Sequence, residues 1–149
     1  MPATKTAKPE VWSDEERAAA QAAVKERKAA SRRDPAEERA GGEADLRAKL
    51  DDMPSDDRAM GERIHEIVTK AMPELMPKTY YGMPAYAKDG KTIAFYKPKS
   101  KFKVRYSTFG FQPDAHLDDG DMWATEFAVI KLTPAVEKKI VDLVKKAAS

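Results

Sequence analysis

The chain has 149 residues with 27 basic and 25 acidic side chains, so its formal net charge of +2 excludes a polybasic or a strongly acidic protein. It contains no cysteine, which excludes disulfides, thiolate metal sites and cysteine nucleophiles. Neither the apolar segment of a signal peptide nor a run approaching the ~20 apolar residues that span a bilayer is present, so we expect a cytoplasmic protein without membrane association.

The first third of the chain predicts a charged helix with little to bury. Ser13 and Glu16 match a capping box, in which each side chain accepts from the backbone amide of the other residue. The helix should begin there and continue to about Ser31, but its apolar positions are nearly all alanine with the single Val24. We therefore expect an exposed N-terminal helical arm, either solvated or docked on a partner.

Residues 34–42 predict a break between this arm and a folded domain. They contain one proline and two adjacent glycines, a composition typical of hinges. Aromatic side chains are absent from residues 13–79, whereas eleven of the twelve lie within 80–127, so apolar burial concentrates in the later part of the chain. The expected division is an arm and linker at 1–42 and a folded domain at 43–149.

Three helices are expected in the folded domain. A short helix at 44–50 is followed by a longer one with Ser55 as its N-cap and two aspartates near the positive end of its dipole. The last helix begins after Thr133, which caps it, with a proline at its first position. The apolar faces consist of Leu46 and Leu50, of Met60, Ile64, Ile67 and Val68, and of Val136, Ile140, Leu143, Val144 and Ala147.

Four strands are expected between these helices, at 84–88, 91–97, 101–109 and 122–129. The first two are joined by Asp89–Gly90, a dipeptide that favours a type I′ hairpin because both central residues need a positive φ. The expected fold class is α+β: a small antiparallel meander of about four strands, packed against N-terminal helices and a C-terminal helix, with the exposed arm outside it.

The run 97–105 carries a positive side chain at every second position. A strand turns alternate side chains to opposite faces, so one face would be cationic and the other apolar. Lysines on an edge strand can block aggregation between sheets, and they can also bind an anion; both interpretations stay open. Aromatic rings that point away from the cations disfavour single-stranded nucleic acid as a partner. The two faces would be Lys99, Lys101, Lys103 and Arg105 on one side and Phe102, Val104 and Tyr106 on the other.

The segment Tyr80–Tyr86, which reads Tyr-Tyr-Gly-Met-Pro-Ala-Tyr, is the most distinctive motif of the chain. Together with the Asp89–Gly90 hairpin, the aromatic and basic strand, and the closing helix after Leu132–Pro134, it resembles the YdhG-like family over residues 44–147. That family is largely a domain of unknown function, and some members are labelled frataxin-like iron chaperones. The resemblance implies a non-enzymatic binding protein that handles iron, with iron as a transient ligand and an iron-accepting protein as a partner.

Two acidic groups are the candidate iron ligands, because carboxylates suit iron when two or more converge. In the second group the spacing excludes an EF-hand, since Gly120 falls at the seventh place counted from Asp114 and Thr125 at the twelfth. Acidic residues near a helix start are also stabilised by the helix dipole, and a solvated turn explains the second group as well. The candidate ligands are Asp51, Asp52, Asp56 and Asp57 in the first group and Asp114, His116 and Asp118 in the second.

A small-molecule or anion site is the alternative to iron. Gly82 permits a backbone turn closed to other residues and Pro84 fixes φ at the start of a strand, so the surrounding aromatic side chains are held at a bend. Such rings can line a pocket, or they can simply cover the end of the sheet. The candidate ligand-binding residues are Tyr80, Tyr81, Met83, Tyr86, Trp123, Lys101, Lys103 and Arg105.

No catalytic constellation is recognisable from residue spacing. No nucleophile stands beside a histidine and an acid at a known spacing, and no glycine-rich phosphate loop is present. His65 follows the apolar Ile64 on a predicted helix, where a structural role is favoured. We therefore do not expect an enzyme.

Overall fold

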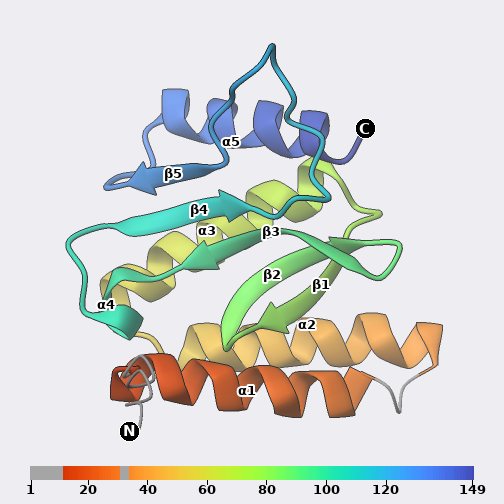
Figure 1. Cartoon of the computed structure of the whole chain (residues 1–149), viewed down its shortest axis with the longest axis vertical. Coiled ribbons are helices and arrows are strands. Elements are labelled where there is room, and N and C mark those ends of the chain that lie inside the picture. Colours follow the sequence, from red (N-terminus) through yellow and green to blue (C-terminus); the bar gives the residue numbers. More distant parts are fainter. Residues whose placement is uncertain (1–11, 31–33) are drawn as a thin grey trace, which may run out of the picture.

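The computed structural model describes residues 12–30 and 34–149. It is an α+β fold in which one antiparallel sheet, with strand order β1-β2-β3-β4-β5, lies against helices (Figure 1). The predicted meander is confirmed, with one strand more than expected. The strands are β1 (Met76–Tyr80), β2 (Met83–Lys88), β3 (Lys91–Lys97), β4 (Ser107–Phe111) and β5 (Glu126–Val129), and the helices are α1 (Asp14–Ala30), α2 (Pro35–Asp51), α3 (Ser55–Ala71), α4 (Lys99–Phe102) and α5 (Pro134–Ala147).

The main core lies between one face of the sheet and the helices α2, α3 and α5. Alternate side chains of the strands point into it, with Tyr86, Tyr96 and Phe109 almost fully buried. The apolar faces predicted for the three helices belong to the same core as these rings. Figure 1 shows α3 crossing behind the sheet. No helix of the described residues is long and apolar enough to span a membrane.

Two tight hairpins shape the first three strands. At Asp89–Gly90 the φ angles are 50° and 80°, both positive as a type I′ turn requires, so the predicted hairpin is confirmed. Tyr81–Gly82 makes a second such turn between β1 and β2, with φ angles of 51° and 78°. The predicted aromatic bend is therefore a two-residue hairpin, and it follows a strand, β1, that the sequence pattern did not reveal.

The prediction of a hinge at 34–42 is wrong, because these residues form the start of α2. Asp34 caps the helix by accepting from the Glu37 amide at 2.8 Å, and proline follows at the first turn. A Cβ atom at Gly42 would lie 2.0 Å from the carbonyl oxygen of Pro77 in β1. The glycine therefore permits close packing of α2 on β1 rather than flexibility, and the expected boundary at 42/43 falls inside a helix.

The helix predicted from the capping box is confirmed as α1. Ser13 Oγ accepts from the Glu16 amide at 3.1 Å, and the Glu16 carboxylate accepts from the Ser13 amide at 2.9 Å. The expectation of an exposed arm needs correction, since Ala19 and Ala23 are buried and α1 packs against β1 and α4. Small alanine side chains allow this close approach without a large apolar face; the predicted end at Ser31 lies outside the described residues.

The prediction that 101–109 forms a strand from its first residue is wrong. Residues Lys99–Phe102 form the short helix α4, Lys103 adopts a left-handed conformation with φ of 55°, and β4 begins only at Ser107. The alternating cationic face therefore does not exist. Contacts of α4 with the start of α3 decide this conformation over the period-two pattern, as tertiary context often does. The strand expected at 122–129 is likewise shorter and starts at Glu126.

A buried polar chain joins α2, α3 and β2 within the core. The side chain of His65 is stacked beside the ring of Tyr86, and its Nδ1 lies 3.0 Å from the tyrosine hydroxyl. Its Nε2 lies 2.9 Å from the Glu43 carboxylate. Since the Glu43 carboxylate can only accept, Nε2 carries the proton, and in this tautomer Nδ1 accepts from the Tyr86 hydroxyl, whose pKa burial raises.

Replacing Tyr86 with phenylalanine is expected to destabilise the fold by about 1–2 kcal/mol, because Nδ1 of buried His65 would lose its hydrogen-bond donor. Urea denaturation of both proteins at pH 7 measures the difference. An unchanged denaturation midpoint would show that this hydrogen bond contributes nothing to stability.

Candidate functional site

The predicted ligand-binding residues do not form one site. Met83 and Tyr86 point to opposite faces of β2, and Tyr86 belongs to the main core. Trp123 lies on the connection from β4 to β5, which Figure 1 shows at the far end of the molecule from the β1–β2 hairpin. Lys103 pairs with Glu15 of α1 at 2.8 Å. The predicted residues therefore do not line one pocket. Arg105 lies over the ring of Tyr106.

Some of the predicted residues do come together on the second face of the sheet. Met83 packs there with Phe95, Tyr80 and Phe102 in a small apolar cluster. The Nζ atom of Lys101 lies 5.6 Å from the centroid of the Phe102 ring. The aromatic bend and one lysine of the basic run thus meet beside the β1–β2 hairpin, although the lysine reaches it from a helix and not from a strand.

The β1–β2 hairpin itself holds a carboxylate. Glu26 of α1 accepts two hydrogen bonds from consecutive backbone amides, one from Tyr81 at 2.9 Å and one from Gly82 at 2.8 Å. Consecutive amides in a turn with positive φ form a concave anion-binding arrangement, sometimes called a nest. A Cβ at Gly82 would lie 2.9 Å from Nζ of Lys101 and 3.6 Å from Ala22 of α1, so the absent side chain leaves room for both.

A pocket of about 320 Å³ opens next to this turn, and we call it the turn pocket. Two of its lining cations, Lys49 from the end of α2 and Lys101 from α4, repel each other across it. Burial and the like charge of Lys49 lower the pKa of Lys101, while Glu26 acts in the opposite direction. The pocket is lined by Lys49, Asp52, Met53, Pro54, Gly82, Pro98, Ser100 and Lys101.

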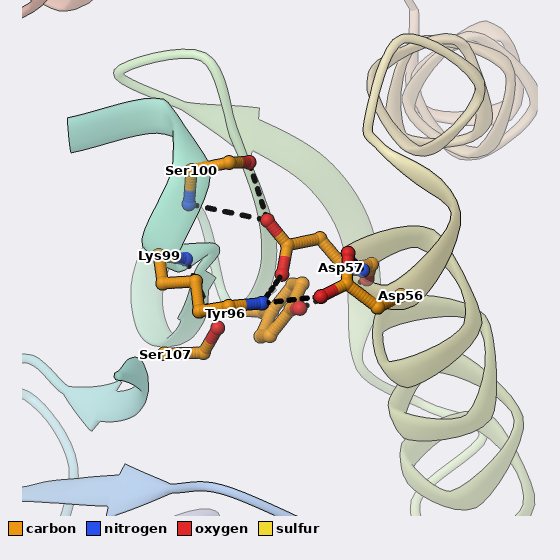
Figure 2. A network of polar contacts seen from close by, with 6 residues as sticks. All are labelled: Asp56, Asp57, Tyr96, Lys99, Ser100 and Ser107. Carbon is orange, nitrogen blue, oxygen red and sulfur yellow. Dashed lines mark hydrogen bonds and ion pairs between the residues drawn. The ribbon is translucent and has the colours of Figure 1, made fainter. Parts of the chain in front are cut away.

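A polar network fixes the wall of the turn pocket that α4 supplies (Figure 2). The buried carboxylate of Asp57 accepts from Nζ of Lys99 at 2.7 Å, from the amide of Ser100 at 3.1 Å and from the hydroxyl of Ser100. Burial raises the pKa of Asp57, but the bonds from Lys99 and Ser100 outweigh it and the net pKa is lowered. The Tyr96 hydroxyl donates to the Asp57 carbonyl oxygen at 2.9 Å. The network therefore ties α4 to the first turn of α3.

The first group of predicted iron ligands is divided between different environments. Asp56 and Asp57 both pair with Lys99, each at 2.7 Å, so the nearest cation to them is a lysine. Asp52 lines the turn pocket, and Asp51 is exposed at the end of α2.

The second group lies on the segment between β4 and β5. Asp114 is 3.8 Å from Nζ of Lys91, and Nδ1–H of His116 donates to the carbonyl oxygen of Ser149 at 2.9 Å. Asp118 is exposed. Within residues 12–30 and 34–149, no three acidic or histidine side chains are arranged to hold a metal ion.

These features define a class of protein: an α+β domain with an open five-stranded meander and a cation-lined pocket at its first hairpin. Comparison with protein-family models, with curated proteins and with solved structures finds no match to this chain. The resemblance to the YdhG-like family therefore stays a prediction.

Glu26, Lys49 and the Asp57 network were missed from the sequence. Glu26 and Lys49 lie on charged helices where nothing in the local pattern separates them from solvated neighbours. Tyr81–Gly82 is the signal that could have been used. A two-residue turn that ends in glycine, between two apolar runs, predicts a tight hairpin, and the backbone amides of such a turn can bind an anion.

Proposed function

We propose that this protein is a non-enzymatic binding module that takes a small anion in the turn pocket. The observation that carries the proposal is the convergence of Lys49 and Lys101 on a pocket whose neighbouring turn amides already hold a carboxylate. The volume of about 320 Å³ lies at the lower end of the range for small-molecule sites, so the ligand would be small.

The electrostatics of the pocket support an anionic ligand. Two ammonium groups that face one pocket repel each other, and the repulsion is stronger where one of them is partly desolvated. An anion between Lys49 and Lys101 would offset both the repulsion and the desolvation. Burial first and Lys49 second lower the pKa of Lys101, and a bound anion would raise it again.

The proposal agrees with the expected cytoplasmic location, and it competes with the expectation of iron handling. The proposal keeps the cytoplasm as the location, as expected from the chain's lack of a signal-peptide-like segment. Iron has less support, since Asp56 and Asp57 are each paired with Lys99. Ferrous iron, titrated into the wild type by the same calorimetry, is the third probe beside the two anions of the experiment below.

Replacing Lys101 or Lys49 with methionine is expected to weaken anion binding at least tenfold, because each change removes a charge that faces the ligand. Isothermal titration calorimetry at pH 7 with succinate and with inorganic phosphate measures the affinity. Lys131→Met is the matched control, since Lys131 is exposed on the connection between β5 and α5 and should leave the affinity unchanged. A Lys101→Met protein that binds either anion as tightly as the wild type would contradict the proposal.

A further inference from the structure

The contact between Glu26 and the β1–β2 hairpin has the geometry of a bound ligand. One carboxylate oxygen faces the Tyr81 amide at 2.9 Å and the other faces the Gly82 amide at 2.8 Å. Two parallel N–H groups matched to the two oxygens of one group recognise a carboxylate, and charge-assisted bonds of this kind are the strong ones. Glu26 thus shows which chemical group fits the hairpin.

The hairpin and the turn pocket form one continuous site. Lys101, which lines the turn pocket, has its Nζ against Gly82 and is close enough to Glu26 for the carboxylate to act on its pKa in the raising direction. Lys49 lines the turn pocket and also an adjoining hollow of about 260 Å³, which Glu26 lines from the other side. A carboxylate bound at the hairpin amides is therefore within the field of both lysines.

The helix that carries Glu26 is held to the domain by few apolar contacts. Its buried hydrophobic residues are the two alanines Ala19 and Ala23, and its largest aliphatic side chain, Val24, is 42% exposed. In the ion pair between Glu15 and Lys103 the lysine is 75% exposed, and pairs at the surface contribute little. The apolar packing of α1 therefore resists the displacement of Glu26 only weakly, and its two hydrogen bonds to the hairpin amides are the contacts that a ligand must replace.

From these observations we propose that the ligand of the site is a carboxylate and that Glu26 is an internal ligand that competes with it for the Tyr81 and Gly82 amides. This inference rests on the proposed function of the turn pocket. A tethered carboxylate occupies the amides at a high effective concentration, so an external carboxylate must displace it and binds with reduced apparent affinity. Ligand binding would then be coupled to the release of α1 from the hairpin.

The test is calorimetric titration of full-length Glu26→Gln with succinate, acetate and inorganic phosphate, beside the wild type. Removal of the competing charge should raise the affinity for succinate about tenfold. Glu26→Ala is the second variant, in case the glutamine amide keeps part of the contact. Glu15→Gln is the matched control, because it removes the ion pair of α1 with Lys103 and leaves the hairpin amides occupied; its affinity should stay within twofold of the wild type. Thermal melts followed by circular dichroism verify that each variant is folded.

The outcomes separate the inference from the proposed function. If the wild type binds succinate through Lys101 but both Glu26 variants bind it no more tightly, competition by Glu26 is refuted and the anion-binding function stands. If phosphate binds Glu26→Gln more tightly than succinate does, the assignment of a carboxylate ligand is refuted. If no anion binds the wild type or either Glu26 variant, the proposed function itself fails.

Discussion

Gly42→Ala is expected to lower the free energy of unfolding by about 3 kcal/mol, the upper end of the usual cost of overpacking. The new Cβ would lie 2.0 Å from the carbonyl oxygen of Pro77 and 3.1 Å from its carbonyl carbon. These are backbone atoms of β1, which cannot rotate aside as a side chain could, so α2 and β1 must separate. Both elements also pack around the β1–β2 hairpin, and the separation would loosen the candidate site.

Urea denaturation at pH 7 measures this effect, and Gly41→Ala is the neighbouring control. Gly41 is a partly buried residue in the same helix, where alanine is favoured over glycine by up to about 1 kcal/mol, so the control should be neutral or stabilising. If Gly42→Ala were as stable as the wild type, α2 would not pack on β1 as closely as described.

Asp57→Ala is expected to destabilise the protein by about 3 kcal/mol. The side chain of Asp57 is 2% exposed and accepts from the Lys99 ammonium and from both the amide and the hydroxyl of Ser100. Its removal leaves the Ser100 donors without their acceptor and one side of Lys99 without its counter-ion, and bonds to charged groups contribute about 1.5–3 kcal/mol each before relaxation. Asp56→Ala, which breaks the exposed contact with the same lysine, should cost much less.

The effect of Asp57 should depend on pH in a defined direction. Its folded pKa is lowered from the ordinary value of 3.8, so the carboxylate stabilises the fold above that pH, and the contribution is lost as the pH falls through the lower, folded value. The stability difference between wild type and Asp57→Ala should therefore be full at pH 7 and shrink below pH ~4. A difference that is the same at pH 7 and pH 3 would mean that the charge of Asp57 is not what stabilises the contact.

The parts of the fold that were predictable are those encoded by neighbouring residues. The capping box of Ser13 and Glu16, the Asp89–Gly90 hairpin and the Thr133 cap each act within a few positions, and all three are present. The apolar stripes of α3 and α5 repeat at helical spacing and both helices formed on them. Local chemistry was sufficient there because no distant contact opposes it.

The parts that were not predictable depend on distant residues. The Lys97–Arg105 run alternates as a strand would, but Asp57, which lies 43 residues before Ser100, binds Ser100 and favours a helical turn. Gly42 lies in a segment with the composition of a hinge, and only the position of Pro77 shows that this glycine allows α2 to pack closely on β1. Such contacts have no signature in the local sequence.

The candidate site shows the same division. Tyr80, Met83 and Lys101 were expected to share a site and do lie together, because the hairpin and α4 meet on one face of the sheet. Tyr86 was expected with them, but it lies on the opposite face of β2 from Met83, so its side chain points into the main core. Glu26 reaches the hairpin from 56 residues upstream of Gly82, so a single sequence could not place it there.

The most direct test of the anion site is a succinate titration of the ¹⁵N-labelled wild-type protein, followed by the backbone amide resonances. We expect the largest shifts at the amides of Tyr81, Gly82, Ser100 and Lys101, and we expect them to be lost in Lys101→Met. Shifts that cluster elsewhere, such as the groove between α3 and α5 lined by Arg63 and Lys145, would contradict the assignment of the turn pocket as the binding site.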